Sequence, residues 1–443
     1  MPVNSFDNYP MSWRPVKAEL ASPLYKGLAA ALERDILSGA LRPGTKLPPQ
    51  RELADFLDIN LSTVTRAFKL CELAGLLRTV RGGGTYVAFA GEGVPSDGSE
   101  AGIDLAMINP FDCPDIIRET IRAVAAKGDF LMDYGYPLGS PRQREAGRMW
   151  MGTPDEVVIV SGGQNGMAIA LSSLLRPGAK VAADEFTYPS FLDLAASLGL
   201  SVIPIPADEE GMLPDALREA GPFDAVYLMP GCANPTGLTM GVSRRLATAE
   251  AAGDALVVED DIYSFLLPHA LPSVGALARR YVAICSTSKS LAPGLRIGYM
   301  SFSPELRDPL VRGIYNINVK SSPFEAEVAA ELILSGAADK ISADKRKISA
   351  QRWAIADEYL PPVAGVPGLF RWQPTPFDCA AAEAEARRNG VRVLHAGRFA
   401  AVPGVSGDFL RVSLCAEPEL SLRRGLTILR DVLARGRQGE LIV

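Results

Sequence analysis

Apolar residues near the N-terminus recur at helical spacing. One stripe runs through residues 24–37, at Leu24, Leu28, Ala31, Leu32 and Ile36, and predicts an amphipathic helix. Residues 50–57 repeat this pattern. A third helix is expected to follow Asn60, a good N-cap, and to reach about Ala74, with an inward stripe of Val64, Ala67, Phe68 and Cys71. Residues 76–80 and 86–89 flank a glycine-rich turn at 81–85 and predict a hairpin.

After residue 103 the pattern changes to short apolar strands that alternate with stretches of helical length. Strands are expected at residues 157–160, 180–183, 201–205, 225–229, 255–258 and 281–285. Such alternation predicts an α/β domain with a largely parallel sheet. Residues 90–103 are rich in Gly, Pro, Ser and acid without apolar periodicity, and predict a linker between domains at 21–89 and 104–443.

Composition and charge narrow the class of protein. Hydrophobic residues make up 48% and charged residues 22% of the chain, as in ordinary globular proteins. The net charge of -6 combines a surplus of three positive charges in residues 1–90 with a surplus of nine negative charges in the rest. No apolar run approaches the roughly 18–20 residues of a membrane span, and the N-terminus lacks the pattern of a signal peptide. We therefore expect a cytoplasmic protein without membrane contact.

Cysteine and histidine usage excludes several kinds of site. The six cysteines are scattered without a C-x-x-C pair, which argues against a disulfide framework and a zinc ribbon. Only His269 and His395 are present, so a multi-histidine metal site and a His-centred triad are excluded. We expect no metal, and both histidines to be structural.

The second and third predicted helices have the spacing of a helix-turn-helix, whose second helix enters the major groove of DNA. Its outward face is Ser62, Thr63, Thr65, Arg66 and Lys69. Seven basic residues against four acids between Arg42 and Arg81 favour DNA over a protein-contact role, which stays an alternative. The glycine-rich turn lacks the strand, helix and G-K-[ST] ending of a phosphate loop.

The motif L-Y-K-x-L-A…P-G-x-K-L-P-x-Q-R-E-L-A…S-T-V-x-R-A-F…G-G-G-T-Y-V resembles the winged helix of GntR-type bacterial repressors over residues 23–88. The resemblance implies that double-stranded operator DNA is the partner, contacted by Arg51, Ser62, Thr63, Thr65 and the wing pair Arg81 and Gly82. Arg66 is added from its outward position. Leu61 stands where these domains commonly place an arginine, so base preference should differ.

Polar groups follow the predicted strands of the second domain. They include a glycine-rich helix start at residues 161–166, Asn234 in an N-P-T-G turn, Asp260 and Tyr263, and Lys289 with nearby hydroxyls and Arg296. Singly, each has an ordinary structural explanation, such as a helix cap, a turn or a solvated lysine. Together they suit a phosphorylated aldehyde, because a lysine forms a Schiff base, an acid protonates a pyridine nitrogen, and a helix start with an arginine binds phosphate.

This set resembles the fold type I aminotransferases, which use pyridoxal 5'-phosphate (PLP), over about residues 104–435. The resemblance implies that Lys289 forms the Schiff base, Asp260 pairs with the pyridinium, Asn234 and Tyr263 reach the phenolic oxygen, and Tyr188 stacks on the ring. The residues implied to hold the phosphate are Gly163, Gln164, Ser286, Ser288 and Arg296. Tyr134 would reach the phosphate of a neighbouring subunit, which implies a homodimer. Arg411 matches the arginine that clamps an α-carboxylate, with an ordinary strand ion pair as its alternative.

The two domains in this order resemble the MocR subfamily of bacterial transcription regulators. The resemblance implies a regulator that binds operator DNA and senses PLP or an amino compound bound in the aminotransferase-like domain. Two alternatives remain. One is an active PLP-dependent aminotransferase with a DNA-binding appendage, since every residue for Schiff-base chemistry is present. The other is a PLP-storage or interaction protein, which predicts no sequence preference on DNA.

Overall fold

The computed structural model describes residues 11–37, 40–42, 44–73, 76–80, 83–88, 102–111, 113–128, 134–402, 405 and 407–437. The chain divides into two compact units, residues 1–101 with 402–405, and residues 102–401 with 406–443. Apart from its last two residues, the predicted linker lies outside the described residues. Ile103, expected as the end of that linker, already pairs with Val391 in the second unit.

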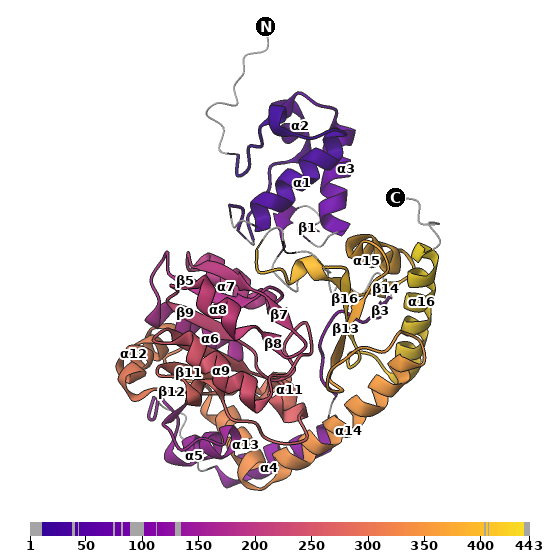
Figure 1. Cartoon of the computed structure of the whole chain (residues 1–443). Coiled ribbons are helices and arrows are strands. Elements are labelled where there is room, and N and C mark those ends of the chain that lie inside the picture. Colours follow the sequence, from indigo (N-terminus) through magenta and orange to yellow (C-terminus); the bar gives the residue numbers. More distant parts are fainter. Residues whose placement is uncertain are drawn as a thin grey trace. The chain divides into compact units, whose positions relative to one another are not determined.

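The first unit is built from three helices and a hairpin, α1 (Leu24–Leu37), α2 (Gln50–Leu57), α3 (Leu61–Leu73), β1 (Leu77–Val80) and β2 (Gly84–Val87) (Figure 1). Its core is the predicted one, with Leu28, Leu32, Val64 and Phe68 fully buried. Leu24 departs from the expected stripe, since 38% of it is exposed. Asn60 caps α3, because its Oδ1 accepts a hydrogen bond from the Ser62 N–H at 2.8 Å.

The predicted hairpin is present, with β1 antiparallel to β2. Its second strand begins at Gly84, two residues before the expected start. The reason is its pairing with β1, in which Gly84 lies opposite Val80 and Thr85 opposite Thr79. On its other edge, the Leu47 N–H donates to the Thr85 carbonyl at 2.8 Å and the Val87 N–H to the Thr45 carbonyl at 2.9 Å.

The second unit is organised around a seven-stranded sheet of order β4-β12-β11-β10-β9-β5-β6. Six strands are parallel, namely β4 (Val157–Val160), β5 (Lys180–Asp184), β6 (Ser201–Ile205), β9 (Ala225–Leu228), β10 (Leu256–Asp261) and β11 (Tyr281–Ser286). The remaining strand, β12 (Gly298–Phe302), runs antiparallel between β4 and β11. The pattern of the sequence found the six parallel strands and missed β12. It also ended β10 at Val258, whereas Glu259 to Asp261 belong to the strand.

Helices cover both faces of this sheet because its strands are apolar on both sides. Ala225 and Tyr227 of β9 share a core with α6 (Gly163–Leu174), α7 (Pro189–Ser197) and α12 (Arg307–Ile317). Val226 and Leu228 of the same strand face the opposite core with α8 (Pro214–Ala220), α9 (Val242–Ala252) and α10 (Val274–Leu277). The short α11 (Thr287–Ser290) follows β11, and the two-residue strands β7 (Ala207–Asp208) and β8 (Gly211–Met212) pair beside β6.

A smaller C-terminal sheet of order β13-β16-β15 packs with long helices (Figure 1). Its strands are β13 (Phe370–Pro374), β15 (Leu394–His395) and β16 (Phe409–Ser413), and its helices are α14 (Ala337–Asp357), α15 (Cys379–Arg388) and α16 (Glu419–Arg437). Beside it, β14 (Val391–Arg392) pairs with β3 (Ile103–Asp104). The polarity of β16 alternates as expected, but residues 410–413 are all buried, so Arg411 is an interior residue.

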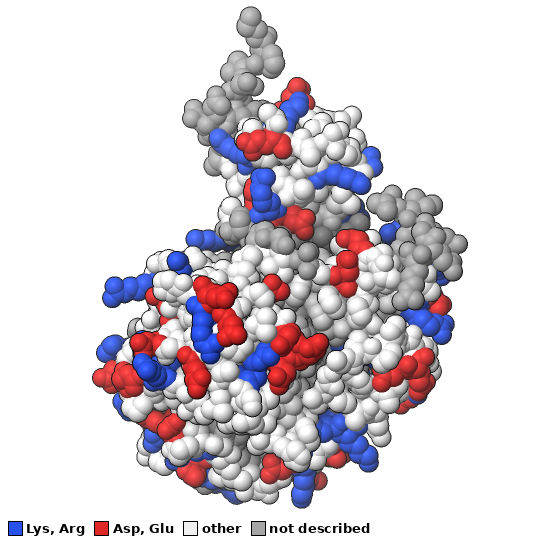
Figure 2. All heavy atoms as spheres, viewed as in Figure 1, with Lys and Arg blue, Asp and Glu red and all other residues white. Residues whose placement is uncertain are grey.

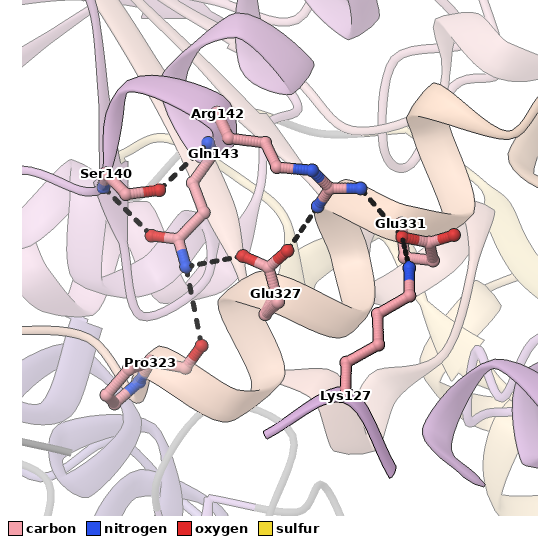
Figure 3. Close-up of polar contacts among 7 residues, drawn as sticks. All are labelled: Lys127, Ser140, Arg142, Gln143, Pro323, Glu327 and Glu331. Atoms are coloured by element: carbon pink, nitrogen blue, oxygen red, sulfur yellow. Dashed lines mark hydrogen bonds and ion pairs between the residues drawn. The ribbon is translucent and has the colours of Figure 1, made fainter. Parts of the chain in front are cut away.

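A polar network joins the remaining helices, α4 (Pro114–Lys127), α5 (Pro141–Met151) and α13 (Pro323–Leu334) (Figure 3). Arg142 pairs with Glu327, and its Nη2 lies 2.7 Å from Glu331, which also holds the Lys127 ammonium at 3.0 Å. These contacts lower the pKa of Glu331, with the Lys127 hydrogen bond as the largest cause. The network fixes the start of α5 and therefore the end of the segment 134–140 that precedes it.

The described residues contain no membrane-spanning helix, no candidate metal site and no disulfide bond. None of their helices is long and apolar enough to cross a membrane. No group of three His, Cys, Asp or Glu side chains among them suits a metal ion. All six cysteines are free thiols, four of them buried.

Candidate functional site

The outward face of α3 has the expected exposure. Ser62, Thr65, Arg66 and Lys69 are exposed, whereas Thr63 is half-buried. Three of these side chains already have partners within the unit. The Lys69 ammonium lies 3.9 Å from the Glu72 carboxylate. Thr65 Oγ1 donates to Gln50 Oε1 at 2.8 Å, and the Arg66 guanidinium lies 4.0 Å over the Tyr25 ring. All three side chains must leave or share these contacts when they meet another molecule.

Arg51 is exposed on α2, and the wing pair Arg81 and Gly82 lies outside the described residues. Lys46 is a further basic residue of this unit that the sequence analysis did not name as a site residue. Its ammonium lies 5.8 Å over the ring of Tyr86 on β2. Figure 2 shows positive and negative side chains interspersed on the visible face of the molecule. The basic surplus of this unit is therefore not gathered into one patch on that face.

In the second unit, Lys289 lies on α11, directly after β11. Its Nζ donates to the Ile108 carbonyl at 2.5 Å. Burial lowers the pKa of Lys289, and the positive charges of Arg411 and Arg296 act in the same direction. A lysine with a lowered pKa has a larger neutral fraction, the form that attacks a carbonyl.

Asp260 lies near the end of β10 and is 3% exposed. Its Oδ2 accepts a hydrogen bond from the Tyr227 hydroxyl at 2.8 Å. Its Oδ1 is hidden from solvent and has no hydrogen-bond partner. Burial raises the pKa of this carboxyl to about 7. A buried oxygen without a partner costs free energy, so this atom is suited to a donor supplied by a ligand.

Tyr227 is a site residue that the sequence analysis missed. It is fully buried in β9, its ring stacks on Phe191 at 3.8 Å, and its hydroxyl reaches Asp260. Its position within an apolar strand gave no signal, because the partner lies 33 residues away on the next strand of the sheet.

The glycine-rich segment, the two serines and Arg296 lie together. Arg296 Nη1 donates to Ser288 Oγ at 3.1 Å, and Ser288 Oγ lies 3.1 Å from Ser286 Oγ. A Cβ at Gly162 would lie 2.7 Å from Arg296 Nη2, and this glycine has φ +90°. Only glycine therefore fits beside the guanidinium.

The start of α6 differs from the expectation. The segment 161–166 was expected to open a helical stretch from Met167, whereas the helix itself already begins at Gly163, because a run of glycines and polar residues hides the apolar face. A Cβ at Gly163 would lie 2.9 Å from Ile262 Cδ1 and 3.9 Å from Asp260 Oδ1. Gln164 is exposed, and its Nε2 donates to the Ser190 carbonyl at 3.4 Å.

Arg411 connects the C-terminal sheet to the turn after β9. Its Nη1 donates to Asn234 Oδ1 and its Nη2 to the Ala106 carbonyl, both at 2.8 Å. Its Nε is buried without a partner. Burial lowers the pKa of the guanidinium to about 10. The alternative role expected for Arg411 was an ion pair within the strand. Among the described residues, Arg411 makes no ion pair.

The two tyrosines Tyr188 and Tyr263 line the same region. Burial raises the pKa of both, and the charges of Asp260 and Arg411 act on each phenol. Tyr263 also packs edge-on against Phe370 at 5.5 Å. Groups from strand ends far apart in the sequence are therefore brought together in one buried polar cluster, here named the cleft.

Tyr134 is the predicted site residue that the fold of one chain does not bring to this cleft. It is 82% exposed and has no polar or ring contact within the part of the chain that the structure describes. His395 is structural as expected, since its Nδ1 accepts from the Gly397 N–H.

Known proteins resemble both units. The family model for bacterial regulatory proteins of the gntR family matches residues 24–87, and the model for aminotransferase class I and II matches residues 104–424. The HTH-type transcriptional regulator YdeF of Bacillus subtilis is 35% identical, over 98% of this chain and 99% of its own length.

Two further proteins are similar to part of this chain. The vitamin B6 salvage pathway transcriptional repressor PtsJ of Salmonella typhimurium is 29% identical, over 61% of this chain and 66% of its own. The kynurenine aminotransferase of Pyrococcus horikoshii, solved in complex with PMP, matches with a TM-score of 0.71 and 26% identity, over 78% of this chain and 93% of its own. The fold of the second unit is thus that of an aminotransferase.

Proposed function

The chain belongs to the MocR-type transcription regulators, in which a GntR helix-turn-helix domain is fused to a class I and II aminotransferase domain, and we propose that its second unit binds PLP and uses it to control DNA binding by the first. The single observation that carries this proposal is the buried Asp260 carboxyl, whose Oδ1 lacks a partner beside the helix start at Gly163. No described residue satisfies this atom, and a pyridinium N–H would.

The other residues of the cleft fit the same group. Ser286, Ser288 and Arg296 would hold the phosphate with the N-terminus of α6. Tyr188 would cover the ring, and Asn234 and Tyr263 would reach the phenolic oxygen. When bound, PLP supplies an aldehyde that the Lys289 amine can engage covalently. Gln164 would approach the phosphate only by leaving the Ser190 carbonyl.

The effector is proposed to be PLP itself or an amino compound that joins it. The name of the relative PtsJ, a repressor of vitamin B6 salvage, supports the first choice. The free Nε of Arg411 supports a carboxylate as part of the second choice, because a guanidinium binds carboxylates in a bidentate manner. Either ligand would shift DNA binding only by binding two arrangements of the protein unequally.

A homodimer is part of the proposal. Tyr134 is exposed in the single chain, and a neighbouring copy would bring this phenol to its phosphate. The DNA contacts are proposed to come from Arg51, Ser62, Thr63, Thr65 and Arg66, with Arg81 and Gly82 of the wing.

The test is fluorescence anisotropy of the purified full-length protein on DNA from upstream of its own gene and on scrambled DNA, with and without PLP. Ionic strength is kept constant, because phosphate contacts make the affinity steeply dependent on salt. We expect a preference for the native DNA that changes with PLP. A Lys289→Ala protein that loses covalent PLP and keeps the full ligand response would overturn the proposal.

The DNA face has its own control. Arg51→Ala and Arg66→Ala should weaken binding about 10-fold each. Arg118→Ala removes an exposed arginine on α4 of the other unit and should leave DNA binding unchanged. Equal losses in all three variants would argue against α2 and α3 as the DNA-reading elements.

An active aminotransferase is the second candidate function. The observation that favours it is that the charge of Arg411 acts on both Lys289 and Tyr263, and the charge of Asp260 acts on Tyr263, so these four groups lie near one another, as turnover would require. A steady-state assay with a panel of amino acids and 2-oxoglutarate separates the two functions. An enzyme converts many equivalents of substrate per chain, and a sensor about one.

A further inference from the structure

A cavity of about 490 Å³ lies within the second unit between the large sheet and the C-terminal sheet. Its walls come from the end of β5, the β7–β8 hairpin, the turn after β9, and strands β13 and β16. None of the residues proposed to hold PLP lines it. Its volume is in the range of small-molecule sites.

The charge of this cavity is of one sign. Five carboxylates line it, those of Asp184, Glu185, Asp208, Glu209 and Glu210, and no Lys, Arg or His is among the described lining residues. Arg244 is not a lining residue, but it contacts two of these carboxylates and compensates part of their negative charge. It holds Asp208 in a two-pronged contact, with Nη1 at 2.9 Å and Nη2 at 2.6 Å, and lies 3.8 Å from Glu210.

The other three carboxylates have no ion-pair partner within the described part of the chain. Asp184, the last residue of β5, has an Oδ1 that is hidden from solvent and lacks a hydrogen-bond partner. Burial, with the charge of Glu185 as the second cause, raises the pKa of Asp184 to about 7. A carboxyl in this situation is stabilised by a cation brought to it.

Aromatic rings also line the cavity. Trp372 stacks on Phe409 with ring centroids 5.2 Å apart, and Phe186 meets Trp372 at 5.5 Å. Carboxylates and aromatic rings in one cavity suit an organic ammonium group, which gains from both the charge and the ring faces. A metal ion is disfavoured, because no group of three described acids here has the geometry to ligate one.

We propose that this cavity binds a small organic amine with more than one ammonium group, between the carboxylates around Asp184 and the Trp372 ring. Three uncompensated acids favour a dication over a single charge. The cavity adjoins the cleft of the proposed PLP site, since Ala233 of its wall precedes Asn234 and Trp372 pairs across the sheet with Arg411. An amine there contacts the large sheet and the C-terminal sheet at once, so its binding would favour the arrangement in which they are close.

The proposal does not depend on PLP binding, and its test keeps the two separate. Isothermal titration calorimetry measures binding of cadaverine, with glutarate as the anion of equal carbon chain length, to full-length Lys289→Ala protein freed of PLP. The alanine prevents covalent capture of the cofactor at that position. We expect saturable binding of cadaverine with one site per chain, and at least 10-fold weaker binding of glutarate.

Variants locate the site. Asp184→Asn and Glu185→Gln in the same background should each weaken cadaverine binding at least 10-fold, whereas Glu119→Gln, the same charge change on the exposed face of α4, should not. Glu185 is half-buried, so its variant keeps the test valid if Asp184→Asn fails to fold. Equal affinity for cadaverine and glutarate, or unchanged affinity in both cavity variants, would overturn the proposal. Failure of PLP to bind wild-type protein would overturn the proposed function and leave this cavity unaffected.

Discussion

At the scale of single residues, Asp260 and Tyr227 form the most consequential pair in the second unit. The pair is buried, and one carboxylate oxygen receives a hydrogen bond while the other receives none. The carboxyl is therefore held in place by Tyr227 and left unsatisfied where a ligand would approach. Such an arrangement costs stability in the ligand-free chain and returns it on binding.

Tyr227→Phe removes the hydroxyl and keeps the stacked ring on Phe191. We expect the free energy of unfolding to fall by about 1–3 kcal/mol, because Asp260 Oδ2 then also lacks a partner. Urea denaturation measures this loss. Tyr299→Phe is the matched control, since the Tyr299 hydroxyl is equally buried and has no hydrogen-bond partner. A loss of the same size in the control would contradict the role given to the Asp260 contact.

The raised pKa of Asp260 has a consequence for the pH dependence of stability. The pKa rises from 3.8 to about 7, so the folded PLP-free chain binds this proton more tightly than the unfolded chain. The stability that results is complete below pH 4 and is lost as the pH rises through 7. Asp260→Asn, whose amide can still accept from Tyr227, should therefore be more stable than wild type at pH 8 by about 2–4 kcal/mol. Thermal denaturation of the PLP-free proteins at pH 4 and pH 8 measures the difference, and a gap that does not grow with pH would refute this reasoning.

At the scale of elements, the start of α6 decides how closely Arg296 approaches the cleft. Gly162 has a left-handed conformation and lies against the guanidinium, and Arg296 itself has φ +49°. Gly162, which precedes α6, and Arg296, which follows the 3-10 helix Pro293–Leu295, are distant in the sequence and are thus fitted to each other. The close contact between Gly162 and Arg296, rather than the local backbone propensity of either segment, places the groups proposed to hold phosphate.

Gly162→Ala should lower PLP affinity at least 10-fold and destabilise the chain by about 2–3 kcal/mol, since its Cβ would displace Arg296 as well as strain the backbone. Gly128→Ala imposes a similar strain at the end of α4, with φ +64° and no atom within 4 Å of the new Cβ. This control should cost about 1 kcal/mol and leave PLP affinity unchanged. Absorbance titration with PLP and thermal denaturation measure both quantities.

At the scale of the whole molecule, one chain combines a DNA-binding unit with an aminotransferase fold. Of the residues proposed to hold PLP, Tyr134 is 82% exposed in the single chain. It lies on the segment that precedes α5, whose first turn is joined to α13 by the contact of Arg142 with Glu327 (Figure 3). In the proposed homodimer, a second copy would supply its partner.

Tyr134→Phe should lower PLP affinity about 5- to 10-fold, the effect of one hydrogen bond to a charged group, without changing the mass of the dimer in sedimentation equilibrium. Tyr136→Phe removes a second exposed hydroxyl from the same segment and should leave PLP affinity unchanged. A monomeric wild-type protein that binds PLP with full affinity would contradict the proposed contribution of Tyr134.

The sequence by itself determined the helices of the first unit, the six parallel strands of the large sheet and the residue types of the cleft. Helical periodicity located α1 to α3 because one face of each packs on the other two, and apolar runs located six parallel strands because helices bury both of their faces. Tertiary structure alone decided which groups meet. Tyr227 reaches Asp260 across neighbouring strands, Arg411 reaches Asn234 from another sheet, and the acidic residues around Asp184 line the same cavity as Trp372. Such contacts join residues far apart in the chain, where local spacing carries no information about distance.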